Sequence, residues 1–253
     1  MTDLAPSRNV ELDGVFNFRD LGGYPTEDGR SLRWRTLFRA DGLGRLTADD
    51  VETLRPIALK TVVDLRRAHE LDERGRFPFE SYPVAFHHLP VIDTTWDREL
   101  ARSENLPATE FLHRAYTAML AEGAPRFAAA FRVLADADAL PAVFHCAAGK
   151  DRTGLLAALV LGALGVAAHD IVDDYALTQA TMERFVARVR SERDGDALID
   201  SVPQTFFAAE PAAMTRVLDD IEQDHGSVRG YVRAIGVESD DLTRLETLLL
   251  VDG

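Results

Sequence analysis

Before position 150, the pattern of apolar and polar residues switches repeatedly along the chain. Short runs typical of strands alternate with longer runs typical of helices. The β-branched, apolar run Thr61–Leu65 predicts a buried strand, and Val84–Val91 and Pro141–Cys146 predict two more. The alternation within Leu32–Ala40 favours a strand at the edge of a sheet. Strands separated by helices are typical of parallel sheets, because parallel neighbours need a crossover connection.

Helix-like spacing lies between the predicted strands and dominates the rest of the chain. Thr47 is a candidate N-cap for a helix over 48–60. Further helices are predicted at about Thr109–Glu122, Pro125–Ala137, Thr153–Val166, Asp170–Arg193, Glu210–Gln223, Ser227–Ile235 and Ser239–Val251. The pattern predicts an α/β fold with a central, mostly parallel sheet flanked by helices and with a helical C-terminal half.

Length and composition fit a single domain spanning residues 1–253. Hydrophobic residues make up 46% of the 253, enough for a sizeable core. Acidic residues outnumber basic ones by 42 to 28, and the resulting net charge of −14 argues against nucleic acid or an acidic membrane surface as a general partner. If the ligand is an anion, a local pocket has to overcome this unfavourable global field.

Cysteine content and apolar segments bear on the compartment. The single cysteine excludes a disulfide within the chain, which fits a reducing compartment. The N-terminal stretch lacks the apolar core of a secretory signal. The longest apolar stretch, Gly154–Ala168, is 15 residues long and predicts a buried helix rather than a bilayer span. We therefore expect a cytoplasmic protein without an integral membrane segment.

The single cysteine lies in VFHCAAGKDRTG, Val143–Gly154, whose pattern is strand, tight turn and helix. The small residues Ala147, Ala148 and Gly149 let the backbone approach a ligand, so the amide groups of the turn can point inward. The helix that follows Lys150 adds unpaired N–H groups and the positive end of its dipole. The stretch therefore predicts an anion site, with a phosphate bound by Ala147, Ala148, Gly149, Lys150, Arg152 and Thr153.

Reactive side chains flank this predicted anion site. The helix terminus and Arg152 would stabilise the thiolate of Cys146, which makes it a nucleophile at neutral pH. The planar guanidinium of Arg152 can hold two oxygens of one phosphate, and the Thr153 hydroxyl can donate to the thiolate. These roles fit phosphoryl transfer through a cysteinyl-phosphate intermediate.

Other interpretations of the stretch fit its residues less well or share its type of loop. One alternative is that Cys146 is only a buried, structural cysteine beside a polar turn. This interpretation does not explain why an arginine, small residues and a strand-to-helix switch coincide at this spacing. A nucleotide-binding loop requires glycine where Phe144 stands and serine or threonine where Asp151 stands. Rhodanese-like sulfurtransferases, arsenate reductases and non-catalytic phosphate-binding modules use a similar type of loop and remain alternatives.

The stretch from Cys146 to Arg152 resembles the Cys-X5-Arg signature of protein tyrosine and dual-specificity phosphatases, and HCAAGKDRTG resembles the bacterial tyrosine and lipid phosphatases among them. NFRDLGGY (Asn17–Tyr24), VVDLR, DDYALT and GSVRGYVRAIGV are similar to motifs of that group and occur in the same order. The resemblance implies a phosphotyrosine-phosphatase-like fold and hydrolysis of phosphate monoesters without a metal or organic cofactor. It implies Cys146 as nucleophile, Arg152 as phosphate clamp, and phosphorylated proteins or phosphoinositides as substrates. NFRDLGGY and the Lys-Asp-Arg-Thr ending of the loop favour a phosphatase over the alternative enzymes.

Three aspartates are candidates for the proton donor that the departing oxygen needs. Asp151 ranks first, because it lies inside the loop and the similar loop of myotubularin-like lipid phosphatases implies an acid there. Asp64 ranks second, because it ends the strand TVVDL at the same sheet edge as Cys146. Asp93 ranks third, because it follows a strand, as in the acid loop of dual-specificity phosphatases.

Other polar residues near the motifs have structural interpretations. His145 alternates to the side of its strand opposite the cysteine, so we expect a hydrogen-bonding role for it. Arg19 and Asp20 are expected to brace the loop or the N-terminal segment. His87 and His88 have no cysteine or carboxylate at ligand spacing, so no metal site is predicted.

The segment 178–210 combines an amphipathic helix, a charged break and the sequence TFF. In a member of the similar group of bacterial phosphatases, paired helices in this place form a lid, so the resemblance implies that the segment moves over the pocket and shields Cys146. A fixed packing helix is equally compatible with the sequence. Nothing in the pattern specifies an oligomeric state.

Overall fold

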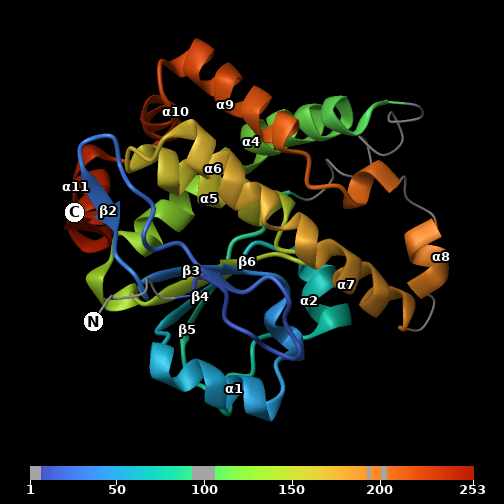
Figure 1. The fold of residues 1–253 in the computed structure, drawn as a ribbon. Coiled ribbons are helices and arrows are strands. Elements are labelled where there is room, and N and C mark those ends of the chain that lie inside the picture. Colours follow the sequence, from blue (N-terminus) through green and yellow to red (C-terminus); the bar gives the residue numbers. More distant parts are fainter. Residues whose placement is uncertain (1–6, 93–105, 193–194, 201–203) are drawn as a thin grey trace.

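A mostly parallel sheet lies at the centre of the molecule (Figure 1). The computed structural model describes residues 7–92, 106–192, 195–200 and 204–253. Within these ranges the sheet has five strands in the order β1 (Arg19–Asp20), β3 (Leu37–Ala40), β6 (Ala142–His145), β4 (Thr61–Asp64) and β5 (Ala85–His88). Only the β1–β3 pair among them is antiparallel. The predicted α/β class with a mostly parallel sheet is confirmed.

Helices cover both faces of this sheet. The described helices are α1 (Ala48–Leu54), α2 (Ala68–Arg74), α4 (Ala108–Leu134), α5 (Asp151–Ala163), α6 (Ala168–Ala176), α7 (Gln179–Arg190), α8 (Gly195–Asp200), α9 (Pro211–His225), α10 (Val228–Ala234) and α11 (Ser239–Leu249). Short 3-10 helices η1 (Leu43–Arg45), η2 (Arg55–Ile57), η3 (Ala137–Ala139) and η4 (Gln204–Phe207) complete the described helices. Figure 1 shows α1 on one side of the sheet and α5, α6 and α9 on the other.

The two faces of the sheet bury different sets of apolar side chains, because successive residues of a strand point to opposite sides. Val63 and Phe144 belong to the larger core, which α4 and α5 complete. Val62 and Val143 belong to a second core, which α1 completes. The face of the sheet to which a strand side chain points therefore decides which of the two cores it joins. It also decides whether that side chain can reach a site on that face.

Helix α5 occupies the centre of the larger core. It overlaps the apolar stretch Gly154–Ala168 that was predicted to be a buried helix, beginning three residues earlier and ending five residues earlier, and all its residues except Gly162 are buried. Among the described residues, no helix has the length and apolar character needed to cross a membrane. Because α5 begins at Asp151, directly after the cysteine loop, its burial anchors that loop at the carboxyl edge of the sheet.

The predicted edge strand Leu32–Ala40 is wrong in two respects. It is broken by a turn in which Arg35 has a φ of 59°, so that β2 (Arg30–Leu32) and β3 belong to different sheets. Strand β2 pairs with β7 (Leu250–Asp252), whereas β3 lies inside the central sheet between β1 and β6. The helix predicted for Ser239–Val251 is correspondingly too long, because β7 takes its last two residues.

Other element boundaries also differ from the prediction. The two helices predicted around residues 109–137 are one helix, α4, which continues through Pro125. The single helix predicted for 170–193 is two, α6 and α7. The N-cap at Thr47 is confirmed, since its hydroxyl accepts the N–H of Asp50 at 3.1 Å, although α1 ends earlier than expected and gives way to η2.

Candidate active site

The loop Cys146–Lys150 joins β6 to α5 at the carboxyl edge of the sheet. Cys146 is 2% exposed and belongs to the larger core. Gly149 has a φ of 66°, and a Cβ atom there would lie 2.6 Å from the carbonyl oxygen of Ala40. Both observations require glycine at this position, because the loop turns back sharply against the end of β3.

The carbonyl groups of the loop are bound from outside. Gly42 N donates to Ala147 O at 3.0 Å, Asn17 Nδ2 donates to Ala148 O and Gly149 O at 3.3 and 3.1 Å, and Arg39 Nη2 donates to Gly149 O at 2.8 Å. In a trans peptide the N–H of the next residue points away from the carbonyl. The amides of residues 148–150 therefore face the inside of the loop, where they form a concave set of donors for an anion.

A buried ion network supports these donors. Asp174 of α6 accepts from Arg19 Nε at 3.0 Å and from Arg39 Nη1, and it also accepts the hydroxyl of Tyr24 at 3.1 Å. Arg19 in turn donates to the side-chain oxygen of Asn17. Burial would raise the pKa of Asp174, but the two guanidinium charges and their hydrogen bonds outweigh burial and hold it well below its usual range. The NFRDLGGY motif thus braces the loop through Asn17 and Arg19, as expected for Arg19.

Arg152 lies in the first turn of α5 and pairs with Glu70 of α2. Its Nη1 and Nη2 donate to the two carboxylate oxygens at 2.6 and 3.0 Å. Burial would raise the pKa of Glu70, but the hydrogen bonds and charge of Arg152 lower it to about 2. Arg152 Nε is buried without a hydrogen-bond partner in the described chain, and so is the Thr153 hydroxyl. The end-on pair with Glu70 leaves the Nε edge of the guanidinium available to an anion.

Lys150 has a different set of contacts from the rest of the loop. Its ammonium donates to the backbone carbonyls of Phe206 and Ala208, the latter at 2.9 Å. It also lies 3.4 Å from the carboxylate of Asp151. Burial lowers the pKa of Lys150. In this structure Lys150 therefore connects the loop to the segment 178–210.

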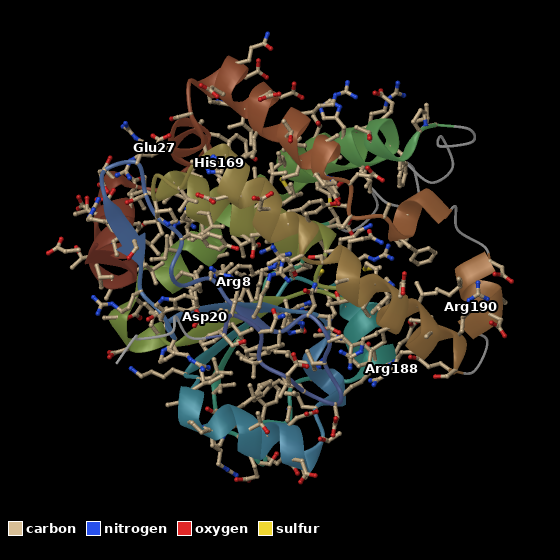
Figure 2. The ribbon with its side chains drawn as sticks, viewed as in Figure 1. Arg8, Asp20, Glu27, His169, Arg188 and Arg190 are labelled. Carbon is tan, nitrogen blue, oxygen red and sulfur yellow. The ribbon has the colours of Figure 1, made fainter. Side chains whose placement is uncertain are left out.

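The described residues of segment 178–210, which we call the covering segment, pack over the loop. Apolar side chains of α7, α8 and η4 form a small core, and Ala148 of the loop packs against it. Figure 2 labels Arg188 on α7; its guanidinium donates to the carbonyls of Gly14 and Asp13 at 3.1 and 3.0 Å. These contacts place the covering segment over the loop, and its motion stays a prediction.

The candidate acid Asp151 lies beside the loop in an aromatic setting. Its Oδ1 accepts the hydroxyl of Tyr116 at 2.6 Å. The Tyr116 oxygen lies 2.7 Å from the hydroxyl of Tyr175, and both rings are buried. Asp151 itself is 7% exposed. Tyr116 of α4 binds the carboxylate, and Tyr175 of α6 holds the Tyr116 hydroxyl in place. The tyrosine pair therefore fixes the direction of the Asp151 carboxylate.

The candidate acid Asp64 faces the other side of the sheet. It pairs in register with His145, so both side chains leave the face opposite that of Cys146. Its carboxylate accepts from Arg66 Nε and Nη2 at 2.9 and 2.6 Å. Burial would raise the pKa of Asp64, but the charge of His145 and the charge and hydrogen bonds of Arg66 outweigh it and hold the value at about 2. The third candidate, Asp93, lies outside the described residues.

The histidines near the sheet edge contact the backbone. His145 Nδ1 lies 3.2 Å from Cys146 O, and burial lowers the pKa of His145. His88 Nε2 lies 2.8 Å from the carbonyl of Arg66. In the part of the chain that the structure describes, no group of three or more His, Cys, Asp or Glu side chains is placed to hold a metal ion.

Several residues of the site carry no local signal in the sequence. Glu70 and Tyr116 lie on helices far from the loop in sequence, and only the fold brings them to Arg152 and Asp151. Arg39 could have been noticed, because it is a cation within the short apolar strand β3, and a buried cation needs a partner.

Comparison with known proteins gives consistent matches over most of the chain. The model of the tyrosine phosphatase family matches residues 10–251. The triple specificity protein phosphatase PtpB of Mycobacterium tuberculosis is 29% identical, over 95% of this chain and 98% of that protein. A tyrosine-protein phosphatase of Nostoc commune is 27% identical, over 83% of this chain and 73% of that protein. The structure of P. aeruginosa TpbA in complex with phosphotyrosine is 16% identical, with a TM-score of 0.38 over 83% of this chain and 91% of that chain.

Proposed function

Because the chain belongs to the tyrosine phosphatase family, we propose that Cys146 is the nucleophile of this phosphatase and that Arg152 clamps the phosphate of its substrate. The observation that supports this most is the loop itself. Three outside donors hold its carbonyls outward, and the Nε edge of Arg152 has no partner among the described residues. Such a set of fixed donors stabilises the negative charge that develops on a transferring phosphoryl group.

The proposed reaction has two steps. The Cys146 thiolate attacks phosphorus, so that an S–P bond forms and the ester P–O bond breaks, with the loop amides and Arg152 binding the phosphoryl oxygens. Water then attacks the cysteinyl-phosphate, the S–P bond breaks, and inorganic phosphate and the thiolate are released. The Thr153 hydroxyl, which is buried without a partner in the described chain, supports the thiolate as a leaving group.

Trapping of the intermediate tests this assignment. Wild-type protein mixed with a labelled phosphotyrosine peptide and quenched in acid within one turnover is expected to carry the label on Cys146, identified by mass spectrometry of the peptide. A sulfurtransferase would instead transfer sulfur from thiosulfate to cyanide, and a binding module would release no phosphate. Label on another residue, or sulfur transfer without phosphate release, would refute the assignment.

The general acid in this scheme is Asp151. It lies in the loop region, and Tyr116 holds its carboxylate in one direction. Asp64 is unsuited to the role, because its side chain leaves the sheet on the opposite face from Cys146 and its carboxylate is held there by Arg66.

Replacement of Asp151 by asparagine is expected to lower kcat for phenyl phosphate, a poor leaving group, by roughly 10²–10⁴-fold, since general acid catalysis contributes about that much. The loss with para-nitrophenyl phosphate is expected to be much smaller, because nitrophenolate departs without a proton. Steady-state rates with both esters across pH provide the measurement, and Asp64→Asn serves as the comparison. If Asp64→Asn lost far more activity with phenyl phosphate than with para-nitrophenyl phosphate, and Asp151→Asn did not, Asp64 would be the general acid instead.

The substrates that we infer are phosphorylated proteins and phosphoinositides, and the name of the Mycobacterium tuberculosis relative, a triple specificity protein phosphatase, fits a range wider than one phosphorylated residue type. Because Cys146 is 2% exposed, we further infer that the covering segment moves aside to admit them. The single, reactive cysteine favours a cytoplasmic location, where thiols stay reduced.

A further inference from the structure

Two tyrosine hydroxyls lie in series behind Asp151, the proposed general acid. Tyr116 donates to Asp151 Oδ1 at 2.6 Å, and the hydroxyl of Tyr175 lies 2.7 Å from the Tyr116 oxygen. The two buried rings meet edge to face, with their centroids 6.1 Å apart. Gly154 of α5 leaves room for the Tyr175 ring, because a Cβ atom there would lie 3.0 Å from Tyr175 Cδ2. Packing therefore fixes both hydroxyls relative to the first turn of α5.

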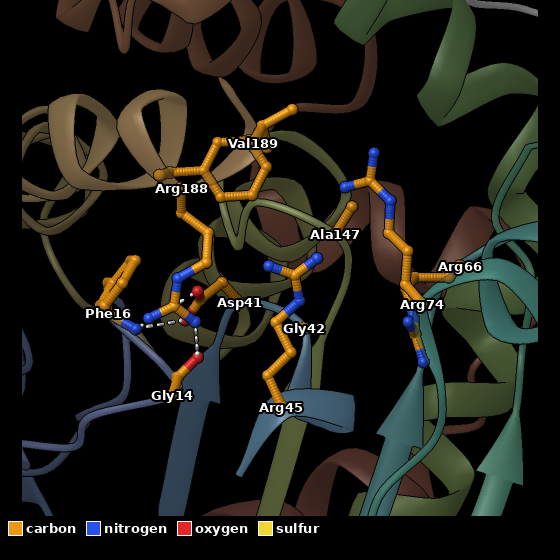
Figure 3. A pocket seen from close by; sticks show the side chains of 11 residues that line it. Gly14, Phe16, Asp41, Gly42, Arg45, Arg66, Arg74, Ala147, Arg188 and Val189 are labelled. Atoms are coloured by element: carbon orange, nitrogen blue, oxygen red, sulfur yellow. Dashed lines mark hydrogen bonds between the residues drawn. The ribbon is translucent and has the colours of Figure 1, made fainter. Parts of the chain in front are cut away.

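The tyrosine pair lies apart from the arginine-lined pocket that borders the loop. That pocket, drawn in Figure 3, touches the loop at Ala147, whose carbonyl is bound from outside by Gly42 N. Neither tyrosine lines it, and Asp151 does not line it either. A variant of either tyrosine therefore tests the acid without altering the pocket.

Only one direction of donation satisfies both hydroxyls. Burial raises the pKa of Tyr116 and that of Tyr175 well above the usual value, so both phenols keep their protons. Tyr175 has no other hydrogen-bond partner in the ranges that the structure describes, so its single proton goes to Tyr116. Tyr116 then gives its own proton to Asp151 Oδ1. In the opposite direction the buried Tyr175 proton would have no acceptor, which is costly.

The two carboxyl oxygens of Asp151 therefore have different surroundings. Oδ1 accepts from Tyr116, and the Lys150 ammonium lies 3.4 Å from it. Oδ2 accepts no hydrogen bond from a described residue, yet it is not one of the fully buried side-chain atoms that lack a partner. Oδ2 is thus the oxygen that keeps contact with the space around the loop.

We propose that Tyr116 and Tyr175 are positioning residues of the acid step, which reserve Oδ1 of Asp151 as an acceptor and so assign the transferred proton to Oδ2. The inference rests on the proposed function of Asp151 and adds the atom that carries its proton. As the ester P–O bond breaks, its electron pair stays on the departing oxygen, and the Oδ2 proton moves to that oxygen. In the second step Oδ2 takes a proton from the attacking water, which restores the acid.

The variant Tyr116→Phe tests the inference, since it removes the donor and keeps the ring. Without this hydrogen bond the carboxyl can turn its proton away from the departing oxygen. The plateau kcat for phenyl phosphate is therefore expected to fall about tenfold, the effect of one hydrogen bond to a charged group. The loss with para-nitrophenyl phosphate is expected to be smaller, because nitrophenolate departs without a proton. Tyr175→Phe acts only through Tyr116, so it is expected to change the rates in the same direction and by less.

Two further readouts separate positioning from a general loss of structure. Loss of a donor disfavours the ionised carboxylate, so the basic limb of the kcat profile for phenyl phosphate is expected to move up by roughly one pH unit in Tyr116→Phe. The charged groups around the pair are Lys150, Arg152 and Glu210, and this variant leaves them in place. In the Asp151→Asn background, Tyr116→Phe is expected to cause no further loss, because its effect passes through that carboxylate.

The matched control is Tyr231→Phe. Tyr231 is also buried, and its hydroxyl donates to the same helix, α4, at Leu120 O with a distance of 2.9 Å. Its replacement removes one buried hydroxyl away from Asp151. The ratio of the rates with the two esters and the position of the basic limb are expected to stay as in wild type.

Equal losses with both esters in Tyr116→Phe and Tyr175→Phe would overturn the inference, and so would a full further loss in the Asp151→Asn background. The acid assignment would still stand if Asp151→Asn alone kept its dependence on the leaving group. If Asp151→Asn showed no such dependence, the acid assignment and the inference would fail together. In each case hydrolysis that requires Cys146 would still support the phosphatase assignment.

Discussion

A protein carrying Cys146→Ser is expected to lose roughly 10⁴–10⁶-fold in kcat with every phosphate monoester, the range typical of loss of a catalytic nucleophile. A serine hydroxyl is not ionised at neutral pH, so it cannot replace the thiolate in attacking phosphorus. The donors of the loop and the Nε edge of Arg152 are untouched by this change. Binding of a phosphotyrosine peptide, measured by calorimetry, is therefore expected to stay within about threefold of wild type.

The separation of binding from turnover makes this prediction specific. In wild type, vanadate is expected to protect Cys146 from alkylation by iodoacetamide, because the anion occupies the loop beside the thiolate. Cys146→Ala provides a control in which no nucleophile of any kind remains. Residual activity above about one per cent in Cys146→Ser would contradict the proposed role.

The replacement Asp174→Asn is expected to lower the free energy of unfolding by about 3–5 kcal/mol, because removal of one partner leaves buried charge uncompensated. Arg19 and Arg39 are 2% and 0% exposed, and both use Asp174 as their carboxylate partner. For a protein of this size the loss corresponds to a fall in Tm of about 10 °C. Urea denaturation gives the free energy directly, and kcat/KM should fall as well, since Arg39 also holds Gly149 O.

The exposed neighbour Asp173 offers a matched control, because Asp173→Asn changes the same helix by the same chemistry without touching the network. Its effect on the free energy of unfolding is expected to be below about 0.5 kcal/mol.

The pH dependence of stability gives a second check on the ion network. The pKa of Asp174 is depressed in the folded protein, so its contribution to stability is present above the unfolded value of ~3.9 and is lost as pH falls toward the folded pKa. The difference between wild type and Asp174→Asn should therefore narrow below about pH 4, and a difference that persisted unchanged would contradict the ion network.

The sequence alone was enough to predict the strand, turn and helix around Cys146, because these elements are contiguous. Cys146, Gly149 and Arg152 lie within one strand–turn–helix unit, and the local backbone determines how they can be arranged. The buried character of α5 and the parallel sheet were also predictable, since apolar runs of strand and helix length are local signals. The break at Arg35, which moves β2 to a second sheet, was not predictable, because it depends on pairing with residues more than 200 positions away.

Only the tertiary structure decided how the charged groups of the site are paired. Glu70 reaches Arg152 across 82 positions, and Asp174 reaches Arg39 across 135. A buried ion requires an opposite charge, but no local pattern specifies which distant residue provides it. The same limit applies to the prediction for Asp64. Its position at a strand end suggested a catalytic carboxyl, but its side chain lies with that of His145 on the face of the sheet opposite Cys146. Local sequence determines which groups can react, whereas long-range packing determines which of them meet.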